Sequence, residues 1–532
     1  MKEKDEYNKL RGGYYTPSEI TEFICKWAID KDDVDVLEPS CGDGAFIKSL
    51  CKRIPKKNSR KKILGIEIDK EEAKKASKYN ATVINDDFFS YYEKEILDKK
   101  KFDCIVGNPP FIRYQNFNKD YREKALRMLE GYNVKLNKLT NIWLPFLILS
   151  SYSLKDAGKL GMVIPSELLQ VDYAAEGRKF LSQFFERITI INFKKLLFEN
   201  AQQEVVILLA EKKADKKGIR MIELDNLDSL KKLDSEDINN IELKTLNLTN
   251  EKWTKYYLNN KELKLLDKID NIKEIPRSTD LFEINVGLVT GENQFFILNK
   301  EEVDKRKLNN SVDKIVGRSE QLSGVILDGK KFKKLVEKGK KVFLFSPKNN
   351  ELDTYSKKYI HYGEEIKANA GYKCRIRKQW YVVPKTWAAD AFILRQVHRY
   401  PKMIYNPNHV FNTDTIHKVR FKENVCAEDV ISAFINSYTF VLCELNGRSY
   451  GGGVLTFEPS EIRNLKIPVK NSKRLDLRKI DKNIMNNAIE SILEENDKIL
   501  LEEGIGLNKE EIKMLREIWK KLSERRINRK LK

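Results

Sequence analysis

The amino-acid sequence predicts an α/β fold with a mainly parallel sheet of the doubly wound kind over the first 210 residues. Short apolar runs, each ending in a turn or an acidic residue, alternate with helical stretches, which is typical of parallel sheets. The runs expected to be strands are 34–39, 62–69, 81–86, 102–110, 160–165, 188–193 and 205–210. Ligands bind such sheets at the carboxyl ends of the strands, so functional residues are expected where these runs stop.

The segments around this sheet differ in texture. Ser18 can cap a first helix, because apolar residues follow it at helical spacing. Residues 211–265 are charged and rich in Asn and Asp, which predicts a linker or peripheral elements. In residues 275–470, strand-like pieces alternate with Gly, Pro and Asn turns, and aromatic residues are interleaved with Lys and Arg. Residues 471–532 are predicted to form basic helices.

The composition favours an intracellular protein that binds a polyanion. The 532 residues include 99 Lys and Arg and 79 Asp and Glu, a net charge of +20. Such a charge is expected to attract nucleic acid first and a membrane surface second. No apolar run approaches the roughly 18 residues of a spanning helix, and the charged N-terminus argues against secretion. Seven scattered cysteines fit a reducing cytosol without structural zinc. We therefore expect a cytoplasmic protein, of about three domains, that makes no membrane contact.

Three consecutive strand ends offer a site for an adenosine. The first strand runs into a turn with Gly42 and Gly44, where the backbone can approach a ligand closely, although a G-x-G turn can equally be only a turn. The second strand ends at Glu67, whose carboxylate can accept hydrogen bonds from both hydroxyls of a ribose. The third ends at Asp87 and Phe88, an acidic residue followed by an aromatic one, which suits an adenine ring.

The fourth strand end indicates the chemistry. Asn108 and Pro109 place a side-chain oxygen beside a carbonyl, which gives two adjacent acceptors for one amino group. Pro109 and Pro110 stiffen the turn and supply no N–H donors. Phe111 can stack on a planar ring. The alternative is a rigid exit from the strand. All four histidines lie in the C-terminal half, so histidine-based catalysis is excluded here.

Taken in order, these motifs resemble those of the gamma-class adenine-N6 DNA methyltransferases, the TaqI type. The motifs are GYYTP (13–17), VLEPSCGDGAF (36–46), GIEID (65–69), NDDFF (85–89) and GNPPF (107–111). This specific match covers the first 210 residues. Further along, the stretches 287–293, 411–415 and 451–460 resemble parts of that family's target-recognition domain more loosely.

The resemblance implies a fold, a domain order and an activity. A Rossmann-like class I methyltransferase domain with a mixed, mostly parallel sheet would span 1–245. An α+β target-recognition domain that binds DNA would span 246–470, and basic terminal helices 471–532. The implied reaction transfers the methyl group of S-adenosyl-L-methionine to N6 of an adenine flipped out of double-stranded DNA, and it requires no metal.

The resemblance also assigns roles to individual residues. Those implied around S-adenosyl-L-methionine are Tyr14, Thr16, Glu38, Pro39, Ser40, Cys41, Gly42, Asp43, Gly44, Glu67, Ile68, Asp87 and Phe88. Those implied at the target adenine are Asn108, Pro109, Pro110 and Phe111. Family members more often have Tyr in place of Phe111, and Phe keeps the stacking face without the hydroxyl. Phe198 is the candidate for a second aromatic on the base, and it could equally be a core residue.

Because the target amine is buried in the duplex, the base must be extruded, and extrusion costs free energy. Phosphate contacts of the basic half are expected to supply that free energy. DNA contact is predicted at Lys373, Arg375, Arg377 and Lys378, with a solvated basic strand as the alternative. Three asparagines near His409 could contact bases or form turns, the usual role of asparagine in loops. They are Asn406, Asn408 and Asn412. The terminal helices would either follow phosphates or pack on the recognition domain.

Other functions stay open at this point. The enzyme could methylate adenine in RNA, or the chain could be a catalytically inactive DNA-binding or specificity subunit. Methyltransferases of release-factor glutamine share N-P-P-F but are small, and an NAD-dependent dehydrogenase would need a third glycine. A fused nuclease is disfavoured, because Glu242–Lys244 fits an E-x-K motif only loosely and no preceding extension is expected. A cognate restriction endonuclease would then be a separate chain, and a monomer is expected.

Overall fold

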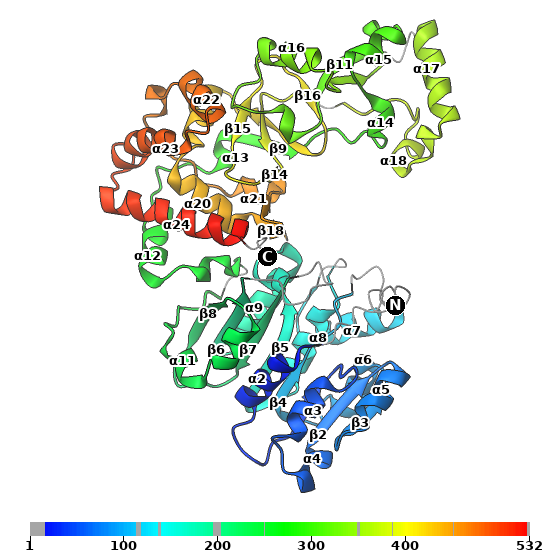
Figure 1. Ribbon diagram of the computed structural model, residues 1–532, viewed down its shortest axis with the longest axis vertical. Helices are drawn as coiled ribbons and strands as arrows, with labels where there is room; N and C mark the ends of the chain where they lie inside the picture. The colour runs from blue at the N-terminus through cyan, green and yellow to red at the C-terminus, as the bar shows by residue number, and fades with distance from the viewer. Residues whose placement is uncertain are drawn as a thin grey trace. The chain divides into compact units, whose positions relative to one another are not determined.

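Two units with their own hydrophobic cores make up the described chain (Figure 1). One unit comprises Met1–Asn260 with Asn528–Lys532, and the other comprises Lys261–Ile527. The computed structural model describes residues 16–112, 119–136, 140–194, 204–248, 251–347, 352–385, 387–450 and 452–528. The three domain ranges expected from the sequence stay a prediction.

An eight-stranded sheet in the order β3-β2-β1-β4-β5-β7-β6-β8 organises the N-terminal unit. Strand β7 runs antiparallel to both neighbours, and the other pairings in this sheet are parallel. This arrangement confirms the predicted mixed, mostly parallel α/β sheet. Its strands are β1 Val36–Glu38, β2 Ile63–Glu67, β3 Thr82–Asn85, β4 Phe102–Gly107, β5 Leu154–Pro165, β6 Arg187–Phe193, β7 Val205–Glu211 and β8 Gly218–Leu224.

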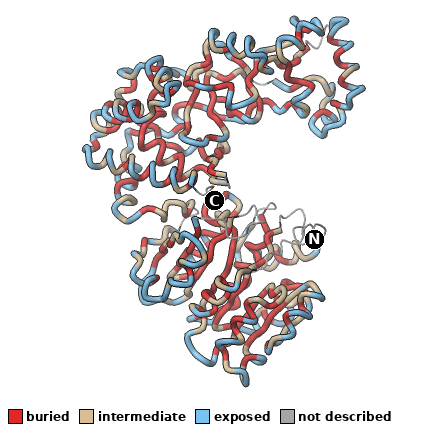
Figure 2. Tube along the Cα trace, viewed as in Figure 1, coloured by how far each residue is buried: buried red, intermediate tan, exposed pale blue. Residues whose placement is uncertain are grey.

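The central strands consist almost wholly of buried residues, as Figure 2 shows, because helices and loops cover the sheet. Continuous apolar runs are the expected sequence of strands buried on both faces. The helices of this unit are α2 Ser18–Ala28, α3 Ala45–Cys51, α4 Lys56–Lys62, α5 Lys70–Ala76, α6 Phe88–Tyr91, α7 Lys119–Gly131, α8 Trp143–Tyr152, α9 Ala175–Phe184, α10 Leu227–Lys232 and α11 Ser235–Asn240.

One local expectation in this unit was wrong. Ser18 does not cap α2, because it is the first helical residue and Pro17 holds the cap position without a side-chain bond. Of the two readings of residues 211–265, the structure shows peripheral elements and not a linker, since β8 closes the edge of the sheet beside β6. Its apolar Ile219 and Ile222 are buried, although charged residues surround them in the sequence.

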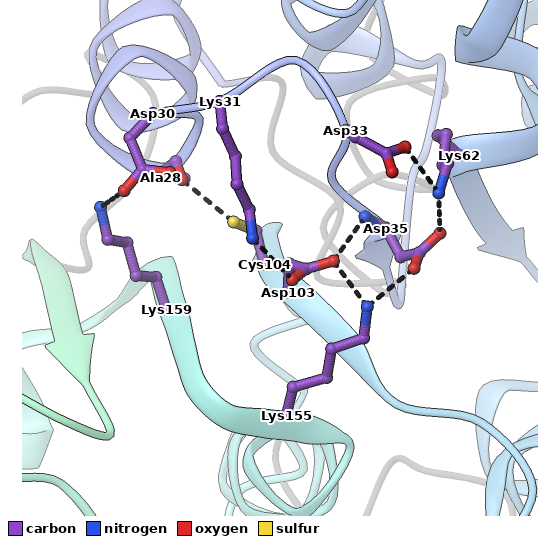
Figure 3. Close-up of polar contacts among 10 residues, drawn as sticks. All are labelled: Ala28, Asp30, Lys31, Asp33, Asp35, Lys62, Asp103, Cys104, Lys155 and Lys159. Atoms are coloured by element: carbon purple, nitrogen blue, oxygen red, sulfur yellow. Dashed lines mark hydrogen bonds and ion pairs between the residues drawn. The ribbon is translucent and has the colours of Figure 1, made fainter.

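A network of ion pairs lies at the amino ends of the central strands, where Figure 3 shows its members. Lys155 at the start of β5 donates to Asp35 over 2.8 Å and to Asp103 over 2.7 Å. Asp103 also accepts from the Asp35 backbone N–H over 2.9 Å. Lys62 pairs with Asp35 over 3.3 Å. Asp35 directly precedes β1, Asp103 lies in β4 and Lys155 lies in β5. The network therefore ties these three strands together at the edge opposite the strand ends described below.

The C-terminal unit is an α+β structure with three small sheets, in the orders β10-β12-β11-β16, β15-β13-β17-β9 and β14-β19-β18. Its strands are β9 Phe282–Val286, β10 Ile297–Leu298, β11 Val312–Val316, β12 Phe343–Phe345, β13 Ala391–Leu394, β14 Gln396–Val397, β15 Met403–Tyr405, β16 Phe411–Asn412, β17 Ile416–Phe421, β18 Arg448–Tyr450 and β19 Val454–Thr456. The predicted C-terminal α+β architecture is therefore confirmed.

Helices surround these sheets, and the predicted terminal helices are present. The helices are α12 Asn260–Asp270, α13 Ser278–Leu281, α14 Asn293–Phe296, α15 Lys300–Lys305, α16 Gly329–Glu337, α17 Thr354–Glu365, α18 Tyr372–Arg375, α19 Ala427–Ala433, α20 Ser437–Asn446, α21 Pro459–Arg463, α22 Leu477–Met485, α23 Ile489–Asp497 and α24 Lys509–Asn528. Among the described helices, none combines the length and the apolar composition needed to cross a bilayer. The apolar face of α24 is buried, with Leu515 and Ile518 fully covered, so this helix packs on the unit.

Candidate active site

The strand ends singled out in the sequence meet at one edge of the sheet. Glu38, Glu67 and Gly107 are the last residues of β1, β2 and β4, which are adjacent and parallel. Parallel neighbours bring their carboxyl ends to the same edge. The structure therefore brings the predicted cofactor residues of two strands next to the predicted catalytic segment that follows β4.

The glycine turn after β1 is closed by the carboxylate of Glu67. The backbone N–H of Gly42 donates to its Oε2 over 2.8 Å, and the N–H of Asp69 donates to its Oε1 over 2.9 Å. Gly42 and Gly44 have φ values of 52° and 89°, a region that favours glycine. A Cβ on Gly44 would lie 2.9 Å from the backbone of Ala76, so this position also requires close approach of two chains. Glu67 is thus held in place by two backbone donors.

Glu38 is a buried carboxyl at the centre of this edge. Its side chain is 2% exposed, and Oε2 has no hydrogen-bond partner among the described residues. Burial, and then the charges of Glu67 and Asp43, raise the pKa of Glu38 well above its ordinary value. An acidic cluster of this kind is stabilised by a cation beside it. Cys41, in the turn after β1, is also buried, and burial raises the pKa of its thiol.

The third strand end lines the next part of the edge. Ile68 is 54% exposed, an unusual position for an apolar side chain. Asp87 caps α6 by accepting the Ser90 N–H over 2.8 Å, and burial raises the pKa of its carboxyl. Phe88 is buried and stacks on Phe146, with ring centroids 4.8 Å apart. The predicted pocket aromatic is thus also a core residue in this structure.

Sequence reasoning did not identify Asn85 as part of this edge. Its Nδ2 donates to the carbonyls of Glu67 and Ile68, over 2.9 and 3.1 Å, and so shapes the loop after β2. The signal that could have found it is its place at the end of β3, one residue before an acidic pair.

Asn108 joins three segments that are distant in the sequence. Its Nδ2 donates to Oγ1 of Thr16 over 3.1 Å. The hydroxyl of Ser40, in the turn after β1, donates to the Asn108 carbonyl over 3.4 Å. The exit of β4 is therefore attached both to the segment before α2 and to the glycine turn. Pro39 beside that turn is buried.

The residues after Asn108 continue into the core. Pro109 is buried, Pro110 is half-buried, and Phe111 is 8% exposed. The next residue, Ile112, accepts the backbone N–H of Ile142 over 3.3 Å. This bond ties the segment to the beginning of α8. The positions predicted for Tyr14 and Phe198 lie outside the described residues.

The predicted DNA-contacting segment of the C-terminal unit forms the short helix α18 and the turns after it. Lys373, Arg375 and Lys378 are exposed. Arg377 is half-buried, and its Nη2 donates to the Val289 carbonyl over 2.7 Å. The segment is helical and not a strand, and it lies against the loop that contains Val289. DNA contact and a solvated basic surface both stay predictions.

Two of the asparagines weighed as base readers are structural. Asn406 is fully buried and bonds to the backbone of Ala389 and Val410. Asn412 is 3% exposed and donates to the Ile416 carbonyl over 2.6 Å. Both therefore hold turns of the unit together. The amide nitrogens of both side chains donate to backbone carbonyls, which a sequence pattern cannot reveal.

Two family profiles match the chain. A family described as N-6 DNA Methylase matches residues 3–317, and one described as the C-terminal domain of the Type II methyltransferase M.Eco57I matches residues 250–501. Among curated proteins, Type II methyltransferase M.AccI of Acinetobacter calcoaceticus is 25% identical over 480 residues, covering 86% of this chain and 85% of that protein. Type II methyltransferase M.HincII of Haemophilus influenzae is 30% identical over 240 residues, 44% of each chain.

Solved structures with a similar fold include the Type IIL restriction-modification enzyme MmeI in complex with DNA. The TM-score is 0.59 at 12% identity, and the alignment covers 95% of this chain and 75% of that one. A DrdV–DNA complex has a TM-score of 0.50 at 13% identity, covering 81% of this chain and 54% of that one. At these sequence identities, the structural similarity shows a shared fold alone.

Proposed function

Because the chain belongs to the N-6 DNA methylase family, we propose that the segment Asn108–Phe111 carries its methyl transfer. The protein is an adenine-specific DNA methyltransferase that modifies the N6 position, and its relatives are Type II methyltransferases. The observation that supports the assignment is the attachment of Asn108 to Thr16 and Ser40 at the end of β4.

The residues at the strand ends fit S-adenosyl-L-methionine, the methyl donor of such enzymes. The unpartnered buried oxygen of Glu38 lies in an acidic cluster, which suits the positive charges of the methionine part. Glu67 is oriented by two backbone donors for a ribose. The exposed Ile68 offers an apolar surface to an adenine. S-adenosyl-L-methionine, when bound, supplies an electrophilic methyl group.

Asn108 and Pro109 prepare the amine of the target adenine. The nitrogen lone pair is delocalised into the ring, so it is a poor nucleophile. We assign the two amine protons to Oδ1 of Asn108 and to the Pro109 carbonyl, which favours a tetrahedral nitrogen and turns its lone pair out of the ring plane. Thr16 accepts from Nδ2, so the amide is held with its oxygen on the opposite side. In enzymes, holding the reacting groups in position and stabilising the charge that develops account for much of the reduction in the activation barrier.

No dedicated base is required in this scheme. Once methylated, the nitrogen carries four substituents and a positive charge, so it is acidic and one of its two protons passes to water. The ring of Phe111 is proposed to stack on the extruded base, and no metal takes part. The stacking role of Phe111 and the roles of Tyr14 and Phe198 rest on the family resemblance alone.

The C-terminal unit is proposed to hold the duplex while the base is extruded, at a cost of a few kcal/mol. The chain's net charge of +20 supports phosphate contacts. We further propose that the protein acts in the cytoplasm as a monomer and that any cognate restriction endonuclease is a separate chain.

A single substitution tests the central assignment. Asn108→Ala should abolish methylation of DNA, while its affinity for S-adenosyl-L-methionine and for DNA stays near that of the wild type. Asn80→Ala is the matched control, because it removes an exposed amide bonded to Lys56 and Ser59 of the same unit. Transfer of radioactive methyl groups to DNA and equilibrium binding give the two readouts. Loss of DNA binding in the Asn108 variant, or activity retained, would refute the proposed role.

A further inference from the structure

One surface of the C-terminal unit combines exposed apolar side chains with exposed cations. We call it the 372–378 tip, after α18 and the turn that follows. Tyr372 is 65% exposed and Ile376 is 60% exposed, among the highest values for large apolar residues in the described chain. Their spacing of four residues places them on one face of the helical turn. Val289, 38% exposed, lies close by, because its carbonyl accepts from Arg377.

The tip is firmly anchored beneath this surface. Cys374 is fully buried, in the same core as Phe295 and Trp380. Arg377 donates to the carbonyls of Val289 and Trp380, over 2.7 and 3.3 Å. The ring of Trp380 packs on Phe295 with centroids 5.0 Å apart. Tyr372 and Ile376 are therefore held outward by a packed base, and their exposure is a property of the folded unit.

A Cβ on Gly291, which has a φ of 87°, would lie 3.1 Å from Cβ of Lys373 and 3.0 Å from Sγ of Cys374. This close approach brings the backbone of residues 287–291 against α18. It fixes the loop of Val289 against α18, so the two segments form one rigid surface.

The positive charge of the tip indicates which kind of ligand it binds. Lys373, Arg375 and Lys378 are exposed around the two apolar residues, and the described residues provide none of the three with an ion pair. Two acidic side chains of the packed elements have other bonds: Glu364 accepts from Trp380 and Glu292 caps α14. A surface of exposed cations around apolar groups complements a phosphate backbone that flanks base edges.

We propose that the 372–378 tip enters a groove of the target duplex and helps to determine the methylated sequence. Tyr372 and Ile376 contact base edges, Lys373, Arg375 and Lys378 contact phosphates, and Arg377 is a positioning residue that holds the tip. This inference rests on the proposed function, because it concerns how that enzyme chooses its adenine. Apolar contacts to base edges carry sequence information, whereas phosphate contacts do not.

The test separates the two kinds of contact. Tyr372→Ala and Ile376→Ala should lower the ratio of methylation rates at the target and at single-mismatch sites by about tenfold, and leave the salt dependence of DNA binding unchanged. Arg375→Gln and Lys378→Gln should each reduce the slope of log affinity against log salt by about one, without changing the preferred sequence.

Matched controls exist on the same unit. Tyr355→Ala removes an exposed tyrosine whose ring lies beside Lys307. Ile366→Ala removes an exposed isoleucine. Both should behave as the wild type. The rates are read from deep sequencing of N6-methyladenine in a randomised DNA pool, and circular dichroism checks folding.

Unchanged discrimination in both Tyr372→Ala and Ile376→Ala would overturn the inference, as would an equal loss in the two controls. If either apolar variant misfolds, Tyr372→Phe and Ile376→Val give the same comparison with smaller changes. A wild-type protein that methylates no DNA would instead refute the proposed function. A wild type that methylates one sequence, with variants indistinguishable from it, refutes only the role of the tip.

Discussion

The side-chain amide of Asn108 donates a hydrogen bond to the hydroxyl of Thr16, 92 residues earlier in the chain, over 3.1 Å. The bond links the segment before α2 to the exit of β4. An amide held on its nitrogen side has a defined place for its oxygen, which is the atom assigned to the amine of the target base. The family resemblance places Thr16 at the cofactor, and the structure adds a contact to the proposed catalytic residue.

Thr16→Val should therefore lower kcat by about five- to thirtyfold, because a lost hydrogen bond of this kind corresponds to roughly 1–2 kcal/mol. Thr16→Ser keeps the hydroxyl and should retain most of the rate. Steady-state kinetics with varied S-adenosyl-L-methionine separate the two possible roles. An effect on KM for the cofactor with kcat unchanged would limit Thr16 to cofactor binding.

Cofactor affinity should depend on pH through Glu38. The pKa of this carboxyl is raised by burial and by Glu67 and Asp43, so it keeps its proton at higher pH than an ordinary glutamate. A positively charged ligand favours the carboxylate, and binding should release a proton. We expect affinity for S-adenosyl-L-methionine to weaken as pH falls through the raised pKa.

Titration calorimetry in buffers of different ionisation enthalpy measures this proton release. Glu38→Gln should abolish the release and weaken binding at high pH. The same raised pKa means that ionised Glu38 destabilises the cofactor-free fold as pH rises through it. Glu38→Gln should thus be at least as stable as the wild type at neutral pH. Proton release that persists in the variant would show that another group titrates.

The network at the opposite edge of the sheet should affect stability without affecting catalysis. Burial opposes ionisation of Asp103, but hydrogen bonds from Lys155 and from the Asp35 N–H outweigh it and lower its pKa. The resulting stability is present above the ordinary pKa of aspartate, about 4, and is lost as pH falls through the lowered value. Asp103→Asn should cost about 1–2 kcal/mol at neutral pH, since Lys155 is partly screened by solvent.

Denaturant unfolding at pH 7 and at successively lower pH checks this difference, which should shrink as the wild-type aspartate is protonated. Affinity for the cofactor should not change. Equal stability of variant and wild type at pH 7 would contradict the account of this network.

A buried ion pair holds the last helix to the C-terminal unit. Arg526 of α24 and Glu444 of α20 are 2% and 3% exposed, and their side chains form two hydrogen bonds, of 3.0 and 2.7 Å. Removing one partner leaves the other charge buried, so Arg526→Met should destabilise the unit by about 3–5 kcal/mol.

The double variant Arg526→Met with Glu444→Leu removes both charges and should recover most of that loss. Thermal melting followed by circular dichroism gives the comparison. Equal losses in the single and double variants would show that the bonds of Arg526 to the carbonyls of His398 and Gly453 matter more than the ion pair.

The sheet of the N-terminal unit and the residues at its edge were predictable because each strand end carries its own local pattern. Glu67 ends a buried run, Asn108 follows one directly and Gly42 lies in the turn after one. Parallel strands bring such ends together. The contacts that hold them, such as Thr16 with Asn108, join residues far apart in the sequence and leave no local pattern. Phe88 shows the same limit, since its stacking on Phe146 depends on how α6 packs against α8.

In the C-terminal unit, the sequence shows the basic segment but not which of its basic residues are exposed and which are packed against the unit. Arg377 and Arg375 have the same chemistry and lie two residues apart. One is half-buried against the Val289 carbonyl and the other is exposed. Only the packing of the tip separates a positioning residue from a surface cation.

The most direct test of the central claim is single-molecule sequencing of plasmid DNA from a methylation-free host that expresses this chain or its Asn108→Ala variant. The account predicts N6-methyladenine at one defined sequence context with the wild-type chain and none with the variant. An unmodified plasmid from cells that contain folded wild-type protein, or the same modification with Asn108→Ala, would contradict it.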